Sequence, residues 1–194
     1  MKINLGSGYT RFPGFLNVDD DPLVEPDFLV NICKEKLPFE DNSVDEMICH
    51  HILEHIGDEF IPLMQEIYRV CSHGAIIHIE VPHPLHEIFL NDPTHKRPIT
   101  VEGMRMFSKK YNRSHIESHG SSSGMGLKFN VDFEIINFNY VHDPFYSEYI
   151  ESYNTRKEQG QTSKDEDWAF IRLFREGYNV AMLTQIKMVV IKDE

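Results

Sequence analysis

The sequence has only three cysteines in 194 residues, Cys33, Cys49 and Cys71. No two of them are close in the chain, and each lies among apolar residues. This pattern is typical of reduced thiols in a hydrophobic core. It argues against both a disulfide framework and a zinc knuckle.

Positive charge is also scarce. The chain carries 19 Lys and Arg against 31 Asp and Glu, which gives a formal net charge of −12. Contacts to the phosphates of nucleic acids depend on Lys and Arg, so we expect no nucleic-acid partner. One basic cluster, formed by Lys109, Lys110 and Arg113, is too small to change this expectation.

Long apolar runs are missing as well. No stretch approaches the roughly 18 apolar residues that cross a bilayer, and the N-terminus has no basic segment followed by an apolar one. We therefore expect no membrane partner and a cytoplasmic protein. The length suits one globular domain with a sizeable core.

Alternating short strands and helices organise the chain. The apolar runs predict strands at residues 3–5, 15–18, 28–32, 44–49, 75–81, 133–141 and 183–191. An open, mostly parallel α/β sheet is the fold class that fits this order. Only ten residues separate Gly8 from Asp19, so the crossover helix that usually joins the first two strands is absent or reduced to a turn.

Helices are predicted at four places. Residues 60–71 carry apolar side chains at spacings of three and four, and Gly74 stands where a glycine that ends a helix is expected. Further helices are predicted at residues 100–110, 147–157 and 164–177. Residues 118–126 (SHGSSSGMG) predict a flexible loop, either a lid over a site or a plain connection.

The first turn has the outline of a nucleoside pocket. Gly6, Ser7 and Gly8 follow the first strand, and Asp19 ends the second. Glycine lets the backbone approach a ligand closely, and a carboxylate at the tip of the next strand is placed to hold a ribose diol.

Several blocks together resemble the class I S-adenosylmethionine-dependent methyltransferases, in a small bacterial type with a shortened first crossover. The blocks are residues 4–8 (NLGSG), 13–19 (PGFLNVD), 37–45 (LPFEDNSVD), 53–56 (LEHI) and 69–81. The resemblance implies a Rossmann-like single domain over residues 1–194 whose last strand is antiparallel. Residues 1–81 would be the cofactor-binding half, and residues 82–194 would supply substrate-side loops, helices and the last two strands.

The resemblance also implies the cofactor site. S-adenosylmethionine would lie against Asn4, Gly6, Ser7 and Gly8, and its ribose hydroxyls would bind Asp19. Backbone amides of the turn and Arg11 would hold its carboxylate. Adenine would lie beside Asn31 and Ile32, and the methyl-bearing sulfonium would face His50 and His51.

Methyl transfer needs a base only where the accepting atom loses a proton. His83, His86, Asp92 and His95 are the candidates, because they follow the fifth strand, at the edge of the sheet where ligands of such folds bind. The alternative is that they cap loop backbone groups. The acceptor is expected to be a small or polar molecule, and the sequence does not indicate an oligomeric state.

Two other functions fit parts of the sequence. His51, Glu54 and His55 match H-x-x-E-H, a zinc-hydrolase pattern that needs a helix and a third ligand. The methyltransferase reading needs no metal and agrees with five blocks instead of one, so we expect no metal site. The other function is a binding module that holds S-adenosylmethionine without catalysing a reaction.

Overall fold

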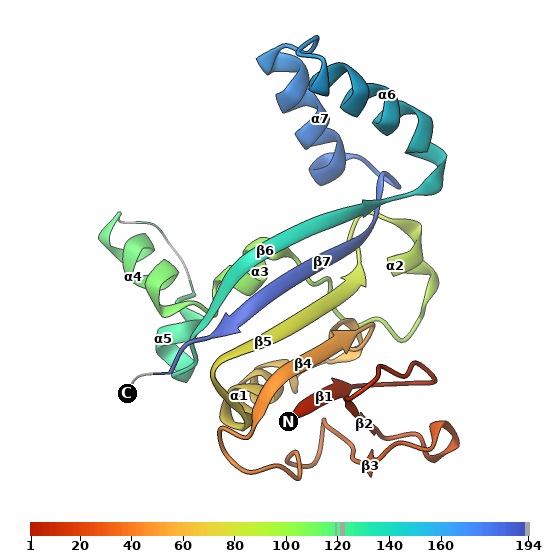
Figure 1. Ribbon diagram of the computed structural model, residues 1–194. Helices are drawn as coiled ribbons and strands as arrows, with labels where there is room; N and C mark the ends of the chain where they lie inside the picture. The colour runs from red at the N-terminus through yellow and green to blue at the C-terminus, as the bar shows by residue number, and fades with distance from the viewer. Residues whose placement is uncertain (119, 121–122, 193–194) are drawn as a thin grey trace.

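The computed structural model describes residues 1–118, 120 and 123–192. In this part of the chain seven strands form one sheet in the order β3-β2-β1-β4-β5-β7-β6. The strands are β1 (Lys2–Leu5), β2 (Leu16–Asp19), β3 (Phe28–Leu29), β4 (Val44–His50), β5 (Cys71–Pro82), β6 (Phe133–His142) and β7 (Ala181–Val190). β7 runs antiparallel to both of its neighbours and the other pairs are parallel, which confirms the predicted fold class (Figure 1).

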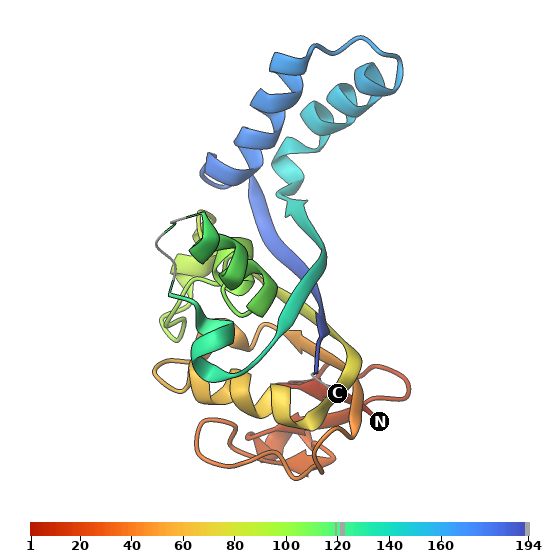
Figure 2. The ribbon, with the colours of Figure 1, turned by 90° about the vertical axis from the view of Figure 1, so that its left-hand side faces the viewer.

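The helices lie mainly on one side of the sheet. They are α1 (Phe60–Val70), α2 (Glu87–Asn91), α3 (Val101–Arg105), α4 (Lys109–Glu117), α5 (Met125–Phe129), α6 (Ser147–Glu158) and α7 (Lys164–Glu176). Figure 2 shows α1, α4 and α5 beside the strands on the same side. None of the helices that the structure describes is both long and apolar enough to cross a membrane.

Buried and partly exposed side chains alternate along the strands, as expected when helices cover one face of a sheet. In β5, Ile77 and Ile79 are buried against the helices, whereas His78 and Glu80 are partly exposed on the other face. β7 repeats the pattern, with Ile186 and Met188 buried. A period of two with one covered face is what a half-buried strand requires.

Helix α1 confirms the predicted periodicity, but the prediction for Gly74 is wrong. The helix ends at Val70 and β5 begins at once with Cys71. Gly74 has φ +80° inside β5, where the register between β4 and β5 shifts after the pair Val44 and Cys71. Its left-handed conformation therefore serves an irregular strand and not the end of a helix.

Three other boundaries differ from the prediction. Only Phe28 and Leu29 of residues 28–32 pair with β2. Residues 100–110 do not form one helix, because the Ser108 side chain accepts a hydrogen bond from the amide of Tyr111 and starts α4 as a separate helix. The predicted loop at residues 118–126 includes residues 119, 121 and 122, which lie outside the described residues, and its last two residues begin α5.

Helices α6 and α7 form a hairpin at the far end of β6 and β7 (Figure 1). A second hydrophobic cluster joins the hairpin to β7 and contains Ile150 of α6, Phe174 of α7, Val180 and Ala181. The rings of Tyr153 and Phe170 stack with centroids 3.6 Å apart. Both helices were predicted from sequence, and the shortened first crossover is also confirmed, since no helix lies between β1 and β2.

Candidate functional site

The turn after β1 is folded against the end of β2. The amides of Gly6 and Ser7 both donate to the carbonyl of Val18, at 2.8 and 3.2 Å, and the amide of Gly8 donates to Oδ2 of Asp19 at 2.8 Å. The three amide groups are thus used within the chain. The turn can still offer carbonyl oxygens, which accept hydrogen bonds from an ammonium group.

Gly6 brings this turn against the segment that follows β4. Its φ is +64°, and a Cβ at this position would lie 2.6 Å from Cγ1 of Ile52. No side chain fits there without displacing Ile52. Glycine at this position therefore sets how closely the ends of β1 and β4 approach.

Each carboxylate oxygen of Asp19 accepts one hydrogen bond. Oδ2 accepts from Gly8, and Oδ1 accepts from the amide of Asp21 at 3.0 Å. Each oxygen of a carboxylate has a second lone pair, so Asp19 can accept two further hydrogen bonds. This is the acceptor pattern that a ribose diol requires.

Asn4 and Arg11 shape the same turn. The buried amide of Asn4 donates to the carbonyl of Thr10 at 3.0 Å and to Oδ1 of Asn17 at 3.1 Å. The guanidinium of Arg11 donates to the carbonyl of Gly8 at 2.7 Å and also to the carbonyl of Val24. Both side chains hold the backbone of the turn in this structure.

The residues predicted to lie beside adenine follow β3. Asn31 donates from Nδ2 to Oδ2 of Asp20 at 2.9 Å, and its Oδ1 accepts from the amide of Cys33 at 3.1 Å. Ile32 is half-buried and packs against the main core. The Asp20–Asn31 contact joins the loops that follow β2 and β3.

His50 and His51 point to different surroundings at the end of β4. The ring of His50 packs edge-on against Phe12 at 5.7 Å, and burial lowers its pKa. His51 has φ +52° and lies 3.5 Å from a carboxylate oxygen of Glu54 and 3.5 Å from one of Glu80. The Glu54 carboxylate beside the ring is the main reason that the pKa of His51 is raised.

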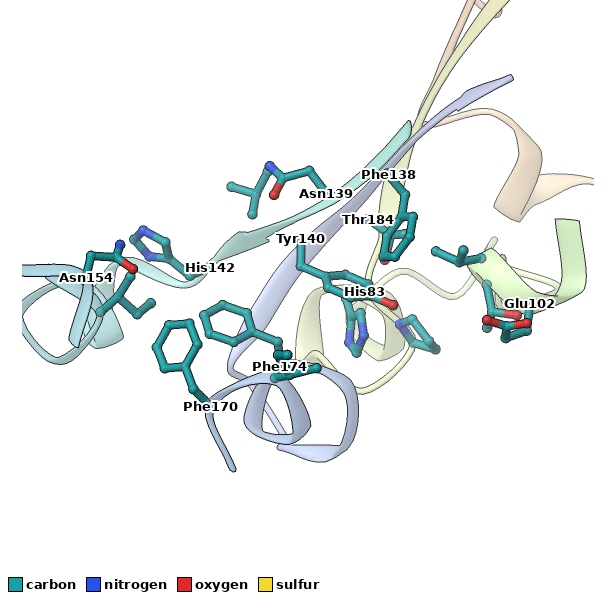
Figure 3. Close-up of a pocket in the computed structure, with 16 residues that line it drawn as sticks. His83, Glu102, Phe138, Asn139, Tyr140, His142, Asn154, Phe170, Phe174 and Thr184 are labelled. Atoms are coloured by element: carbon teal, nitrogen blue, oxygen red, sulfur yellow. The ribbon is translucent and has the colours of Figure 1, made fainter. Parts of the chain in front are cut away.

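The four candidate bases lie in separate places. His83 lines a cavity of about 1010 Å³ between β6, β7 and α7, together with Phe138, Tyr140 and Phe174 (Figure 3). Its Nδ1 accepts from the amide of Leu85 at 3.3 Å, so the neutral ring carries its proton on Nε2. Burial lowers the pKa of His83 to about 4, which keeps it neutral at pH 7.

His86 has both ring nitrogens engaged. Nδ1 accepts from the amide of Ile88 at 3.1 Å and caps α2, and Nε2 donates to Oδ2 of Asp143 at 3.0 Å. With no nitrogen lone pair left, His86 is placed as a structural residue.

Asp92 and His95 line a second cavity, of about 520 Å³, at the ends of β4 and β5. His51, His55 and Pro82 also line it. Asp92 accepts from both the amide and the hydroxyl of Thr94, and these bonds lower the pKa of its carboxyl group. The four candidates thus divide between two cavities and one capping position.

The H-x-x-E-H pattern does not lie on a helix. Leu53–His55 is a single 3₁₀ turn, and His51 precedes it in a left-handed conformation. The two histidines are therefore not one helical turn apart, as the hydrolase pattern requires. The described residues therefore lack the helix that the hydrolase alternative needs, because β4 continues to His50 and a single 3₁₀ turn follows it.

Sequence reasoning missed the aromatic cavity and the role of Thr94. The cavity brings together residues of β6 and α7, which are more than 25 positions apart, and its only signal was the run of aromatic residues in both segments. Thr94 bonds His55 and Asp92, and no spacing in the sequence indicates that contact.

Comparisons with known proteins agree on the fold. Residues 16–79 match the family model of a methyltransferase domain. An S-adenosylmethionine-dependent methyltransferase of Archaeoglobus fulgidus superposes with TM-score 0.54 at 15% identity, over 97% of this chain and 85% of that one. The YcgJ protein of Bacillus subtilis gives 0.56 at 15% identity, over 100% and 92%.

A third similar structure is a complex with small molecules. It is phosphoethanolamine N-methyltransferase 2 of Haemonchus contortus with S-adenosylhomocysteine, at TM-score 0.53 and 15% identity, over 98% of this chain and 48% of that one. No curated protein matches the chain.

Proposed function

We propose that this chain is a class I S-adenosylmethionine-dependent methyltransferase that transfers the methyl group to a small polar acceptor. The domain match over residues 16–79 and the sheet order support this class. One observation carries the proposal for the site: the turn at Gly6 to Gly8 lies against Asp19, whose two oxygens each retain a free lone pair. That arrangement suits the ribose and the methionine part of one nucleoside ligand.

The cofactor would extend along the ends of β3, β2, β1 and β4. Asp19 accepts the ribose hydroxyls, and Asn31 and Ile32 flank the adenine. The carbonyls of the turn accept from the cofactor ammonium group, with Asn4 and Arg11 fixing the turn. His50 and His51 lie nearest to the sulfonium.

The smaller cavity is the proposed place of the acceptor. It lies next to His51 at the ends of β4 and β5, and its lining includes Asn91, Asp92 and His95. These polar side chains can form hydrogen bonds with a polar acceptor. The larger aromatic cavity lies further along β6 and β7.

The reaction needs proximity more than acid–base chemistry. A lone pair of the acceptor attacks the methyl carbon, and the bond from carbon to sulfur breaks with its electrons on sulfur. The products are S-adenosylhomocysteine and the methylated acceptor, which gives up one proton to water where it carried one. The enzyme contributes alignment and a water-poor pocket.

Asp19→Ala tests the cofactor site. We expect it to weaken binding of S-adenosylhomocysteine by about 1.5–3 kcal/mol, the scale of hydrogen bonds to a charged group, measured by isothermal titration calorimetry. Asp19→Asn keeps an oxygen for the amide of Gly8 but removes the charge, so its loss should be smaller.

The control is Asp165→Ala in the first turn of α7, which should leave the affinity unchanged. Unchanged affinity in a folded Asp19→Ala variant would exclude Asp19 from the site. A screen for S-adenosylhomocysteine release over a panel of polar acceptors then tests transfer. Tight cofactor binding without turnover on any acceptor would favour the non-catalytic binding module.

A further inference from the structure

Three potential metal ligands meet beside the smaller cavity. One donor atom from each of Glu54, His55 and His95 lies within 4.8 Å of the donor atoms of the other two. The amides of Lys96 and Arg97 donate to the carbonyl of Glu54, at 2.8 and 3.2 Å. The backbone therefore fixes the loop that carries His95 against the turn that carries the other two.

Glu54 is the unusual member of this cluster. Its side chain is buried, with 0% of the residue exposed, and neither carboxylate oxygen has a hydrogen-bond partner among the described residues. Nδ1 of the His51 ring lies 3.5 Å from Oε1. A buried carboxylate without hydrogen bonds is costly, and a bound cation would remove that cost.

His95 keeps a nitrogen lone pair for a ligand. Its Nδ1 lies 2.7 Å from the carbonyl of Phe89, which can only accept, so Nδ1 carries the proton. Nε2, which lies 3.8 Å from Oδ2 of Asp92, is then unprotonated in the neutral ring. A histidine that donates its other N–H to a carbonyl is the usual arrangement of a metal ligand.

His55 has the same arrangement through Thr94. The Thr94 hydroxyl donates its one hydrogen to Oδ1 of Asp92 at 2.6 Å, so it can only accept from Nδ1 of His55, at 2.9 Å. The lone pair of His55 is therefore on Nε2. The rings of His55 and His95 lie edge to face with centroids 4.7 Å apart.

We propose that Glu54, His55 and His95 bind a divalent transition-metal ion. Two imidazoles and one carboxylate suit Zn²⁺ and similar ions, whereas Mg²⁺ prefers oxygen ligands alone. Tetrahedral coordination at the usual bond lengths would draw the donor atoms to roughly 3.4 Å from one another. The proposal departs from our expectation, based on sequence, that the chain has no metal site.

The ion would have an open position toward the cavity. Three protein ligands leave at least one coordination site of Zn²⁺ unfilled, and His55 and His95 both line the cavity. An oxygen or nitrogen of the polar acceptor is the ligand class that fits. This use of the ion rests on the proposed function, whereas binding of the ion does not.

The site is tested by titrating the untagged, metal-free chain with Zn²⁺ in a calorimeter. A parallel titration with Co²⁺ is monitored by visible absorption. We expect one ion per chain, and visible Co²⁺ bands typical of a low-coordinate site. Glu54→Gln and His95→Gln should each weaken binding at least about 100-fold. His78→Gln removes a histidine that also contacts a carboxylate, Glu46 at 3.0 Å, and should have no effect.

The metal site is refuted if the wild type binds neither ion, or if both cluster variants bind Zn²⁺ as tightly as the wild type. His95→Gln changes a loop residue, so it decides the matter where Glu54→Gln fails to fold. The affinity for S-adenosylhomocysteine is measured on the same samples. A wild type that binds S-adenosylhomocysteine but neither ion refutes only the metal site, and a wild type that binds Zn²⁺ but not S-adenosylhomocysteine refutes only the proposed function.

Discussion

Two neighbouring regions at the strand ends differ in whether their polar groups are hydrogen-bonded. At the end of β1 and β2, the amides of Gly6, Ser7 and Gly8 and both oxygens of Asp19 have partners within the chain. At the end of β4, the buried carboxylate of Glu54 has none among the described residues. The polar groups of the first region are therefore hydrogen-bonded before a ligand binds. The second region holds a buried charge that a ligand would have to neutralise.

Mutations should therefore act differently at the two ends. At the first end, each change either strains the turn or removes a hydrogen bond that already stabilises the folded chain. At the second end, removing the unsatisfied charge should not destabilise the chain and should instead remove a binding site.

Gly6→Ala should have the largest effect on stability. It forces alanine into a left-handed conformation and places a Cβ 2.6 Å from Ile52. Strain and overpacking together should lower the free energy of unfolding by about 2–4 kcal/mol in urea titrations.

Gly8→Ala is the matched control for Gly6→Ala. Its φ is +49°, and no atom of the described residues lies within 4 Å of the added Cβ, so only the backbone cost of about 1 kcal/mol applies. Equal losses for the two variants would contradict the close approach of the turn to Ile52.

Arg11→Met should have an intermediate effect. It removes charged hydrogen bonds to the carbonyls of Gly8 and Val24 but keeps much of the apolar stem. We expect the free energy of unfolding to fall by about 1–2 kcal/mol, and cofactor affinity to fall with it because the turn loosens.

The control Arg113→Met, at an exposed position of α4, should stay within about 0.5 kcal/mol of the wild type. A stable Arg11→Met variant with normal cofactor affinity would show that the turn does not depend on this guanidinium.

Glu54→Gln should have the smallest effect, with the opposite sign. In metal-free buffer, loss of a buried charge without hydrogen bonds should raise the free energy of unfolding by about 1 kcal/mol. Glu46→Gln removes a carboxylate that contacts Lys2 and His78, and should instead lower it by about 0.5 kcal/mol. A loss of stability in Glu54→Gln would mean that Glu54 already has an effective partner, such as the ring of His51.

Local patterns in the sequence predicted most of the fold. The spacing of Phe60, Met64 and Ile67 predicted α1, and the alternating residues of β5 and β7 predicted half-buried strands. The prediction for Gly74 was wrong because the sequence around a glycine after a helix is similar whether the glycine ends the helix or lies in an irregular strand. The start of α4 was missed because Ser108 caps it through its side chain, in a stretch that reads as continuous helix.

The candidate site was less predictable because it depends on contacts between distant segments. Asp19 was identified from its position after a strand, but its bonds to Gly8 and Asp21 come only from the folded loops. Glu54 and His55 were recognised as a pair, whereas His95 joins them from 40 residues away through the amides of Lys96 and Arg97. The H-x-x-E-H alternative grouped Glu54 and His55 with His51 instead, on a helix that the described residues do not form.

One paired calorimetric measurement tests the central claim that the two ends bind different ligands. S-adenosylhomocysteine and Zn²⁺ are titrated separately into the wild type, Asp19→Asn and Glu54→Gln. We predict that Asp19→Asn weakens binding of S-adenosylhomocysteine and leaves Zn²⁺ binding unchanged, and that Glu54→Gln does the reverse. Loss of both ligands in either folded variant, or of neither in both variants, would contradict the account.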